Sequence, residues 1–507
     1  MSPMSGCKII PVIIVVGVFN LLAACTATRQ ATLQITGPPL PSPTSPSPTD
    51  IQQETPTPIT SPEPAITPSE PAGMPVVPCL QVVDSFYSDT GQLRVVFTAR
   101  CVTVGGLGDV SSDLWLWREE TDTAEAYPLP AGAVTPRLSA DHQLILFRKF
   151  LSETESELWV IGVDGGGERM LARVSYAEAM QRNPEATFFD LEYAWLKNTR
   201  RVVYRVSVGY DLGLSPYDTV FVVDAGTGEE RVIVLPGEVY WLVYSPAGDQ
   251  AAALTFEELR LIDTRTGQVQ FSIALSGVPY SNQPQSYAPD GAHALVFGPE
   301  KIFVIDAQTG ALQEIPLAFS PWGVGDAPAH LPGVYWLDGS SFYTVVVNLE
   351  GEEDFFFPEA TFTVWEVDLS LGEARSISTF KGIVPNPDYY TSDLERLIYF
   401  HNVELNNPVQ ELNVADIRNG EDRLYATGTY RFSGWNMDNA HFLIQAEDGT
   451  LYLGGFDQEL TLLPVPSTIS SIRWVDAQRF LAIEYDDAQE LRLYTLDGES
   501  ILISSGG

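Results

Sequence analysis

One turn sequence recurs at near-regular intervals in the middle of the chain. In each copy an aspartate is followed three positions later by Thr-Gly, and the clearest copies place Asp224, Asp263 and Asp306 39 and 43 residues apart. Each copy lies between two short apolar runs that are typical of β-strands. A fixed period of this length constrains the fold more than any other feature, because it indicates a repeated supersecondary unit.

A second turn type alternates with the first. Asp, Asn, Gly or Pro residues precede strongly β-prone runs, as in 139–142 before 144–147 and 288–291 before 294–297. These residue types accept left-handed backbone or bond their own backbone two residues on. Each unit therefore reads strand, turn, strand, loop, strand, turn, strand, which is the order of one four-stranded antiparallel blade.

Nine such units can be counted, with second turns near residues 121, 164, 224, 263, 306, 368, 416, 457 and 497. The sequence thus predicts an all-β fold, a single β-propeller of four-stranded antiparallel blades. Because four to eight blades are usual, we favour eight, with the first unit the prime candidate for a decorating hairpin; a ring of nine is the alternative. A helical pattern is strong only at 176–182, where Asn183-Pro184 ends it.

The first 24 residues have the pattern of a signal peptide. Lys8 precedes an apolar run over 9–22, and Leu22-Ala23-Ala24-Cys25 looks like a bacterial lipobox. A membrane span is the alternative, but the run is shorter than the ~20 apolar residues that a span requires. We expect lipid attachment at Cys25, which would hold the protein to a membrane on its extracytoplasmic face.

A linker follows the lipidation motif over residues 25–78. Residues 38–78 contain 14 of the 37 prolines of the chain, together with many Ser and Thr. Because proline fixes φ and removes a hydrogen-bond donor, this segment is predicted to be a disordered, extended stalk. The propeller domain is expected to occupy residues 79–507.

Charge and cysteine content restrict the partners and the compartment. The chain has 28 Lys and Arg and 66 Asp and Glu, which gives a net charge of −38. Because such a surface repels a phosphate backbone, no nucleic acid partner is expected. Cys79 and Cys101 flank the turn at 88–91, and a hairpin about that turn would bring them together as a disulfide, which an exported protein permits. Two buried thiols are the alternative.

Two segments resemble a known repeat. Residues 139–147 and 157–169 look like the TolB-like (PD40) propeller repeat of bacterial proteins, and the Asp-x-x-Thr-Gly turns are similar to those of quinoprotein-like and surface-layer propellers. The resemblance covers most of residues 80–507. It implies a fold and not a shared activity, because these motifs are structural.

The residues that could carry chemistry are few. Five tryptophans fall on expected first strands and are interpreted as packing between blades, with an aromatic ring for a sugar or peptide as the alternative: Trp195, Trp241, Trp336, Trp435 and Trp474. The five histidines lack metal-ligand spacing, and neither a Gly-x-Ser-x-Gly nucleophile motif nor a calcium loop occurs in the sequence. We predict no catalytic residue, metal ligand or cofactor, while the question of an enzyme stays open.

Long insertions between units are the better candidates for binding, because loops on a rigid scaffold commonly carry function. Their aromatic side chains are Tyr210, Tyr217, Trp322, Phe355, Phe356, Tyr389 and Tyr390. The sequence thus predicts a lipid-anchored, extracytoplasmic propeller that binds a protein, peptide or glycan partner in the cell envelope. The alternatives are a lactonase-like or quinoprotein-like enzyme with an axial metal or cofactor, and an envelope spacer without a specific ligand.

Overall fold

The computed structural model describes most of residues 76–506. Outside the description lie residues 1–75, 105–107, 153, 183–187, 198, 211–212, 215–216, 240, 256–257, 276–284, 299–300, 317–333, 350–358, 384–386, 404–408, 487 and 507. The predicted signal peptide, Cys25 and all but the last residues of the predicted stalk therefore fall outside it.

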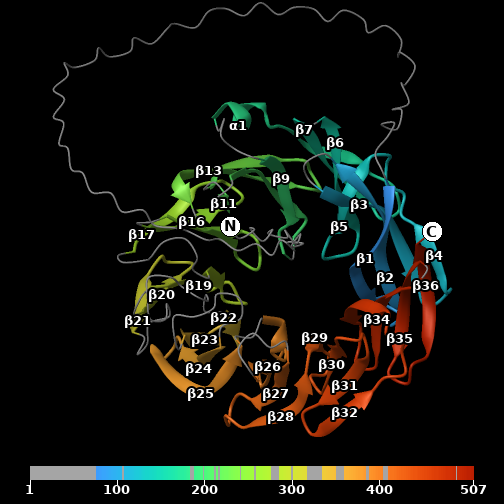
Figure 1. The fold of residues 1–507 in the computed structure, drawn as a ribbon. Helices are drawn as coiled ribbons and strands as arrows, with labels where there is room; N and C mark the ends of the chain where they lie inside the picture. Colours follow the sequence, from blue (N-terminus) through green and yellow to red (C-terminus); the bar gives the residue numbers. More distant parts are fainter. Residues whose placement is uncertain are drawn as a thin grey trace, which may run out of the picture. The chain divides into compact units, whose positions relative to one another are not determined.

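Consecutive antiparallel strands form the blades, which we number 1 to 9 in chain order (Figure 1). Blades 1 to 3 comprise β1 (Val76–Tyr87), β2 (Leu93–Val104), β3 (Gly108–Arg118), β4 (Thr123–Ala126); β5 (Ala133–Leu138), β6 (Leu144–Ser152), β7 (Glu155–Gly162), β8 (Arg169–Ser175); and β9 (Phe188–Trp195), β10 (Arg201–Tyr210), β11 (Gly213–Leu214), β12 (Tyr217–Asp224), β13 (Glu230–Val239). Blades 4 to 6 comprise β14 (Trp241–Tyr244), β15 (Gln250–Leu254), β16 (Glu258–Asp263), β17 (Val269–Ala274); β18 (Gln285–Tyr287), β19 (His293–Phe297), β20 (Lys301–Asp306), β21 (Leu312–Pro316); and β22 (Val334–Trp336), β23 (Ser341–Leu349), β24 (Glu359–Asp368), β25 (Glu373–Ile383).

Blades 7 to 9 complete the series. They comprise β26 (Arg396–Asn402), β27 (Gln410–Asp416), β28 (Asp422–Gly428); β29 (Tyr430–Trp435), β30 (His441–Ala446), β31 (Leu451–Gly455), β32 (Gln458–Leu462); and β33 (Ile469–Trp474), β34 (Arg479–Tyr485), β35 (Gln489–Thr495), β36 (Ser500–Gly506). In blade 7 the place of a first strand is taken by the 3-10 turn η1 (Pro387–Tyr389) and a bridge between Tyr390 and Leu397.

The recurrent aspartate turns are the hairpins between the third and fourth strands. In the turn after β20, the Asp306 carboxylate accepts the N–H groups of Gln308 (3.0 Å) and Thr309 (2.7 Å), and the Gly310 N–H donates to the Asp306 carbonyl (2.9 Å). Gly310 has a φ of +70°, which a Cβ would strain. Asp224 and Asp263 make the same bonds, so the repeated aspartates stabilise turns and do not form a site.

Strands in the middle of each blade are buried on both faces, because each sheet packs against two neighbours. In β19, Ala294 and Val296 pack toward blade 4, whereas Leu295 and Phe297 pack toward blade 6. All four are at most 1% exposed. This explains why the run 294–297 is continuously apolar instead of alternating.

Nine hydrophobic clusters join the blades in order, each between two successive blades. Hydrogen bonding alone gives eight sheets, because blades 6 and 7 are joined by a single pair, Ile383 and Phe400. The described chain therefore contains nine blades, and the preference for eight is corrected. The first unit is not a decorating hairpin, since β1–β4 form a sheet with a packed neighbour on each side.

The ring closes between blades 9 and 1 without an exchanged strand. Blade 1 contains only the first strands of the described chain and blade 9 only the last (Figure 1). Val95 and Phe97 of β2 pack against Leu481 and Ile483 of β34, and the Leu80 N–H donates to the Gln489 side chain at 3.1 Å. Closure therefore depends on side chains and not on a shared sheet.

Helical structure in the described residues is limited to α1 (Ala177–Arg182) and η1. The predicted helix at 176–182 is thus confirmed to within a residue. In the part of the chain that the structure describes, neither helix has the length and apolar character needed to span a bilayer.

Candidate binding site

Blades 7, 8 and 9 line a hollow of about 790 Å³, which we call the aromatic pocket. Tyr389 and Tyr390 come from the start of blade 7, Trp435 from β29 and Trp474 from β33. First strands of successive blades lie side by side here, as the contacts between β29 and β33 show, on the inner side of the ring (Figure 1). The volume falls in the range of small-molecule and peptide-residue pockets, roughly 300–1,000 Å³.

Tryptophans on the first strands of four blades form hydrogen bonds to the preceding blade. The indole N–H groups donate as follows: Trp195 to the Arg137 carbonyl (3.1 Å), Trp336 to the Ser286 hydroxyl (2.9 Å), Trp435 to the Tyr389 carbonyl (2.9 Å) and Trp474 to the Gly434 carbonyl (3.0 Å). The interpretation of these four tryptophans as packing between blades is confirmed. The side chain of Trp241 is not among those that the structure describes. Two of the four also form the pocket wall, so the same bonds hold its shape.

Backbone irregularities in both first strands border the pocket. The register of β29 shifts between Phe432 and Gly434, and that of β33 shifts between Ser470 and Arg473. Ser471 adopts a φ of +52°, a left-handed conformation that is unusual for a residue with a side chain. Such bulges redirect side chains and occur often beside functional sites.

Two arginines and one carboxylate are the charged residues of the pocket wall: Arg431, Arg473 and Asp388. The Arg473 guanidinium lies 3.9 Å from the Asp84 carboxylate of blade 1. Arg431 is exposed, and within the described residues no carboxylate oxygen lies within 4.0 Å of its guanidinium. The pocket wall therefore carries more positive than negative side chains, although the chain as a whole has a net charge of −38.

Amide side chains in the pocket wall already serve the fold. Asn436 accepts the N–H groups of Ala440 (3.1 Å) and His441 (3.0 Å), and it donates to the Ala477 carbonyl (3.1 Å). Gln445 donates to the Ile469 carbonyl at 2.7 Å, which ties β30 to β33. These amides are already engaged by the scaffold, and the charged groups of the wall are Arg431, Arg473 and Asp388.

Tyr389 and Tyr390 differ in their surroundings. Tyr389 packs edge to face against Phe432, with ring centroids 4.9 Å apart. Tyr390 is buried against Tyr335, and its hydroxyl has no hydrogen-bond partner among the residues that the structure describes. Burial, with a smaller contribution from Tyr335, raises the pKa of Tyr390 well above its usual value, so the hydroxyl stays protonated and can donate.

The side chains of the other residues predicted for binding are not among those that the structure describes. Tyr210 and Tyr217 lie in β10 and β12, but their side chains are outside the description, as are Trp322, Phe355 and Phe356 altogether. The structure brings Tyr389 and Tyr390 together with Trp435 and Trp474. Sequence reasoning missed Arg431, Arg473 and Met437; basic residues on first strands of so acidic a chain were the signal that could have indicated the arginines.

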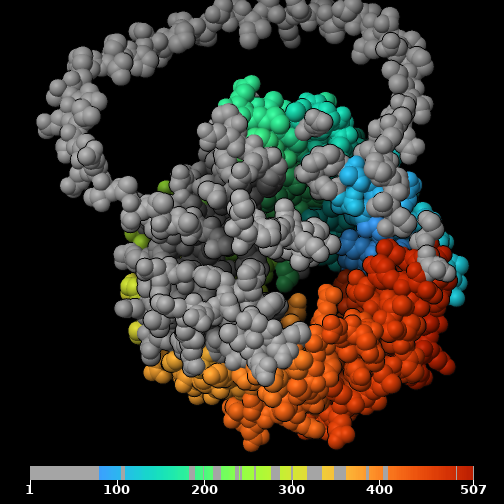
Figure 2. Space-filling view, viewed as in Figure 1, coloured from blue at the N-terminus to red at the C-terminus, as the bar shows by residue number. Residues whose placement is uncertain are grey.

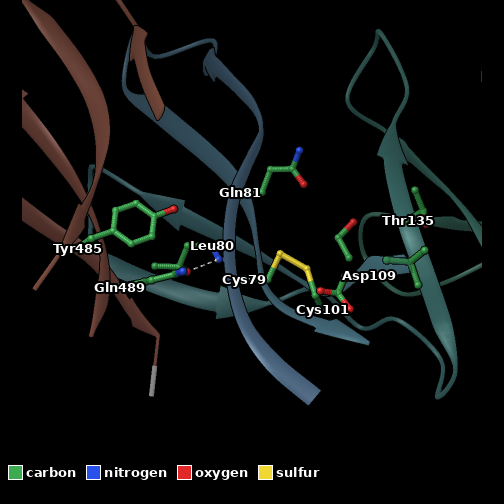
Figure 3. A pocket seen from close by; sticks show the side chains of 10 residues that line it. Cys79, Leu80, Gln81, Cys101, Asp109, Thr135, Tyr485 and Gln489 are labelled. Atoms are coloured by element: carbon green, nitrogen blue, oxygen red, sulfur yellow. Dashed lines mark hydrogen bonds between the residues drawn. A yellow bond between two sulfur atoms is a disulfide. The ribbon is translucent and has the colours of Figure 1, made fainter. Parts of the chain in front are cut away.

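A second hollow, of about 390 Å³, lies at the junction of blades 9, 1 and 2 (Figure 3). Cys79 and Cys101 form a disulfide on its wall, at the open end of the β1–β2 hairpin. Gln489 and Tyr485 of blade 9 lie at one side of it, next to Leu80, and Thr135 of blade 2 lies at the other (Figure 3). Cys79 precedes Leu80, whose N–H donates to Gln489 of blade 9. The disulfide therefore stabilises the start of blade 1 where it contacts blade 9.

Metal-ligand clusters are not found in the described part of the chain, where no three His, Cys, Asp or Glu side chains are grouped closely enough to hold an ion. The Cys25 site and several long loops fall outside that part.

Comparisons with known proteins add a structural likeness only. No protein-family model and no curated protein matches this sequence. Among solved structures, a crystal structure of the eukaryotic initiation factor is 10% identical, with a TM-score of 0.49, covering 77% of this chain and 96% of that one. Dipeptidyl peptidase 4 of Porphyromonas gingivalis is also 10% identical, with a TM-score of 0.44, covering 75% of this chain and 60% of that one. The propeller assignment thus rests on the nine blades themselves, and the TolB-like resemblance stays a prediction.

Proposed function

We propose that this chain is a lipid-anchored, extracytoplasmic β-propeller that binds a protein, peptide or glycan of the cell envelope through the aromatic pocket. One observation carries the binding role: aromatic side chains and two arginines converge from three blades on a single hollow. The lipobox-like sequence ending at Cys25 and the proline-rich segment 38–78 support the anchor and the stalk.

The pocket side chains suit contact with a ligand better than acid-base catalysis. Burial raises the pKa of Tyr390, so its hydroxyl stays protonated at neutral pH and is not a base. Trp435 and Trp474 have their indole N–H groups bonded to the scaffold, so these rings shape the pocket wall and offer no group for proton transfer. A propeller enzyme with an axial metal or cofactor would instead be indicated by stoichiometric metal in the purified full-length protein.

The anchor is tested by Cys25→Ala. We expect this variant to keep its uncleaved leader and to lose incorporation of labelled palmitate, because the thiol that carries the lipid is absent. Wild-type processing and wild-type palmitate labelling of Cys25→Ala would overturn the lipidation part of the proposal. Ser5→Ala, a change of similar size outside the lipobox, is the matched control.

The binding role is tested by crosslinking the full-length protein in its native envelope. Met437 lines the pocket and is 65% exposed, whereas Leu371, 69% exposed, lies in the turn after β24 away from it. Met437→Arg should remove the crosslinked partner band, because a long charged side chain would fill the pocket, and Leu371→Arg should retain it. Equal bands from both variants would overturn the assignment of binding to this pocket.

A further inference from the structure

We propose that the aromatic pocket recognises the free carboxylate of a peptide C-terminus, with the apolar side chain of the last residue held beside Met437. This inference rests on the proposed function, since it names the ligand class for the same pocket. It follows from the charges of the pocket, from the faces of its aromatic rings and from the free edge of its central strand.

With two arginines against one carboxylate, Asp388, the pocket wall carries a net positive charge that favours a single carboxylate. Guanidinium groups match carboxylates with two parallel N–H···O bonds, which fix orientation as well as sign. Arg431 has no carboxylate of its own within 4.0 Å among the described residues, and Arg473 has only the Asp84 oxygen at 3.9 Å. The net charge of −38 over the whole chain repels extended polyanions, so a ligand with one terminal charge is favoured over an acidic polymer.

The aromatic rings favour a peptide over a sugar. A sugar ring needs an open aromatic face to stack on, but Tyr390, Phe432 and Trp474 are only 7–9% exposed. Trp435 packs edge to face on Phe442 with centroids 5.1 Å apart. The exposed apolar group is Met437, and a flexible thioether adapts to apolar side chains of different shape.

The central strand offers backbone groups to an extended chain. Within its sheet β29 is an edge strand that pairs with β30 alone. Its other edge pairs with no strand in the described part of the chain, although β33 lies nearby and the Trp474 indole donates to the Gly434 carbonyl. An extended peptide beside 431–433 would meet main-chain groups, as in recognition by strand addition.

The experiment is calorimetric titration of the full-length protein with three probes. The first is a pool of N-acetylated hexapeptides ending in Ala, Leu or Phe with a free carboxylate. The second is the same pool amidated at the C-terminus, and the third is a tetrasaccharide of glucuronic acid. We expect the first probe to bind, and the amidated pool to bind at least ten-fold more weakly, because the amide removes the charge that Arg431 and Arg473 would pair with.

Variants locate the interaction. Arg431→Gln should weaken binding of the free peptides at least ten-fold while leaving the amidated pool unchanged. Arg423→Gln is the matched control: Arg423 is also an exposed arginine without a carboxylate partner among the described residues, but it lies on β28 outside the pocket. Equal binding of the two peptide pools, binding of the tetrasaccharide alone, or no binding of any probe would overturn the peptide proposal. If Met437→Arg still removed the crosslinked partner band in that case, the pocket would remain the binding site and only the peptide ligand would be wrong.

Discussion

The Tyr87 hydroxyl donates to the Asp476 carboxylate at 2.7 Å, joining residues 389 positions apart in the sequence. Arg479 donates to the same carboxylate at 2.7 Å and also pairs with Glu119 of blade 1. Burial raises the pKa of Asp476, but the hydrogen bonds from Tyr87, the Gln478 N–H and Arg479 outweigh it, so the pKa lies below its usual value. Tyr87, Asp476, Arg479 and Glu119 form one polar cluster of the seam that closes the ring.

Arg479→Met should lower the free energy of unfolding by about 1–2 kcal/mol, because it leaves two partly buried carboxylates without their cation. The Arg479 side chain is 22% exposed, whereas Arg375, paired with Glu366, is 75% exposed. Arg375→Met should lower the free energy of unfolding much less, because an ion pair exposed to solvent contributes little. Urea unfolding followed by far-UV circular dichroism compares them, and equal losses would contradict the importance of the seam.

Stability should fall in acid through the turn aspartates. Burial raises the pKa of Asp263, but the N–H groups of Arg265 and Thr266 outweigh it; at Asp306 the Thr309 hydroxyl and N–H lower the pKa. A carboxyl whose pKa is lower in the folded state stabilises fully above its unfolded pKa of about 4, and this contribution is lost as the pH falls through the folded pKa. Urea midpoints measured between about pH 6 and pH 2.5 should therefore decline.

The double variant Asp263→Asn and Asp306→Asn should show a shallower decline, because Asn keeps the acceptor oxygen but does not titrate. The wild-type slope is the reference. An unchanged slope in the double variant would mean that other carboxyl groups dominate the acid response.

Trp474→Phe should cost about 1 kcal/mol of stability by removing the hydrogen bond to the Gly434 carbonyl. Trp336→Phe is a matched control, since it removes the equivalent bond to Ser286 in a blade away from the pocket. Both variants should be destabilised similarly, but only Trp474→Phe should weaken ligand binding, because Trp474 lines the pocket. Equal loss of binding in both would indicate a general effect of stability.

Replacing both Cys79 and Cys101 by Ala should destabilise the protein by about 3 kcal/mol, the loop-closure value for a disulfide that spans 22 positions. Reduction of the wild type should give a similar shift in the urea midpoint. Two reactive thiols in the unfolded, unreduced mature protein, which would lack Cys7 and carry lipid on Cys25, would show that the bridge is absent in solution.

The repeat pattern predicted the blades well, because turn chemistry is local. Asp224, Asp263 and Asp306 bond to amides two and three residues away, and their spacing alone located the hairpins. The same turns counted nine units, the number of blades found, but the usual range of four to eight blades led us to favour eight. Closure of the ring was not predictable from the turns, because clusters such as Val95 with Leu481 join residues hundreds of positions apart.

The pocket was predictable only in part, for the same reason. Tyr389 and Tyr390 stood out because they follow a long loop, whereas Arg431 and Arg473 look like ordinary polar residues of strands. Their proximity follows from bulges at Gly434 and Ser471 and from the Trp474 indole bond, none of which has a sequence signature of its own.

Each blade is made from one uninterrupted stretch of chain, and this affects how the protein is assembled during synthesis. The strands of a blade can pair as soon as its own residues have emerged, since none of them comes from the other end of the described chain. Only the final step is long-range, when residues 469–506 meet the face of blade 1 that has been exposed since the beginning. A nonsense mutation before residue 469 would thus release an open arc with two uncovered apolar faces, which we expect to aggregate or be degraded.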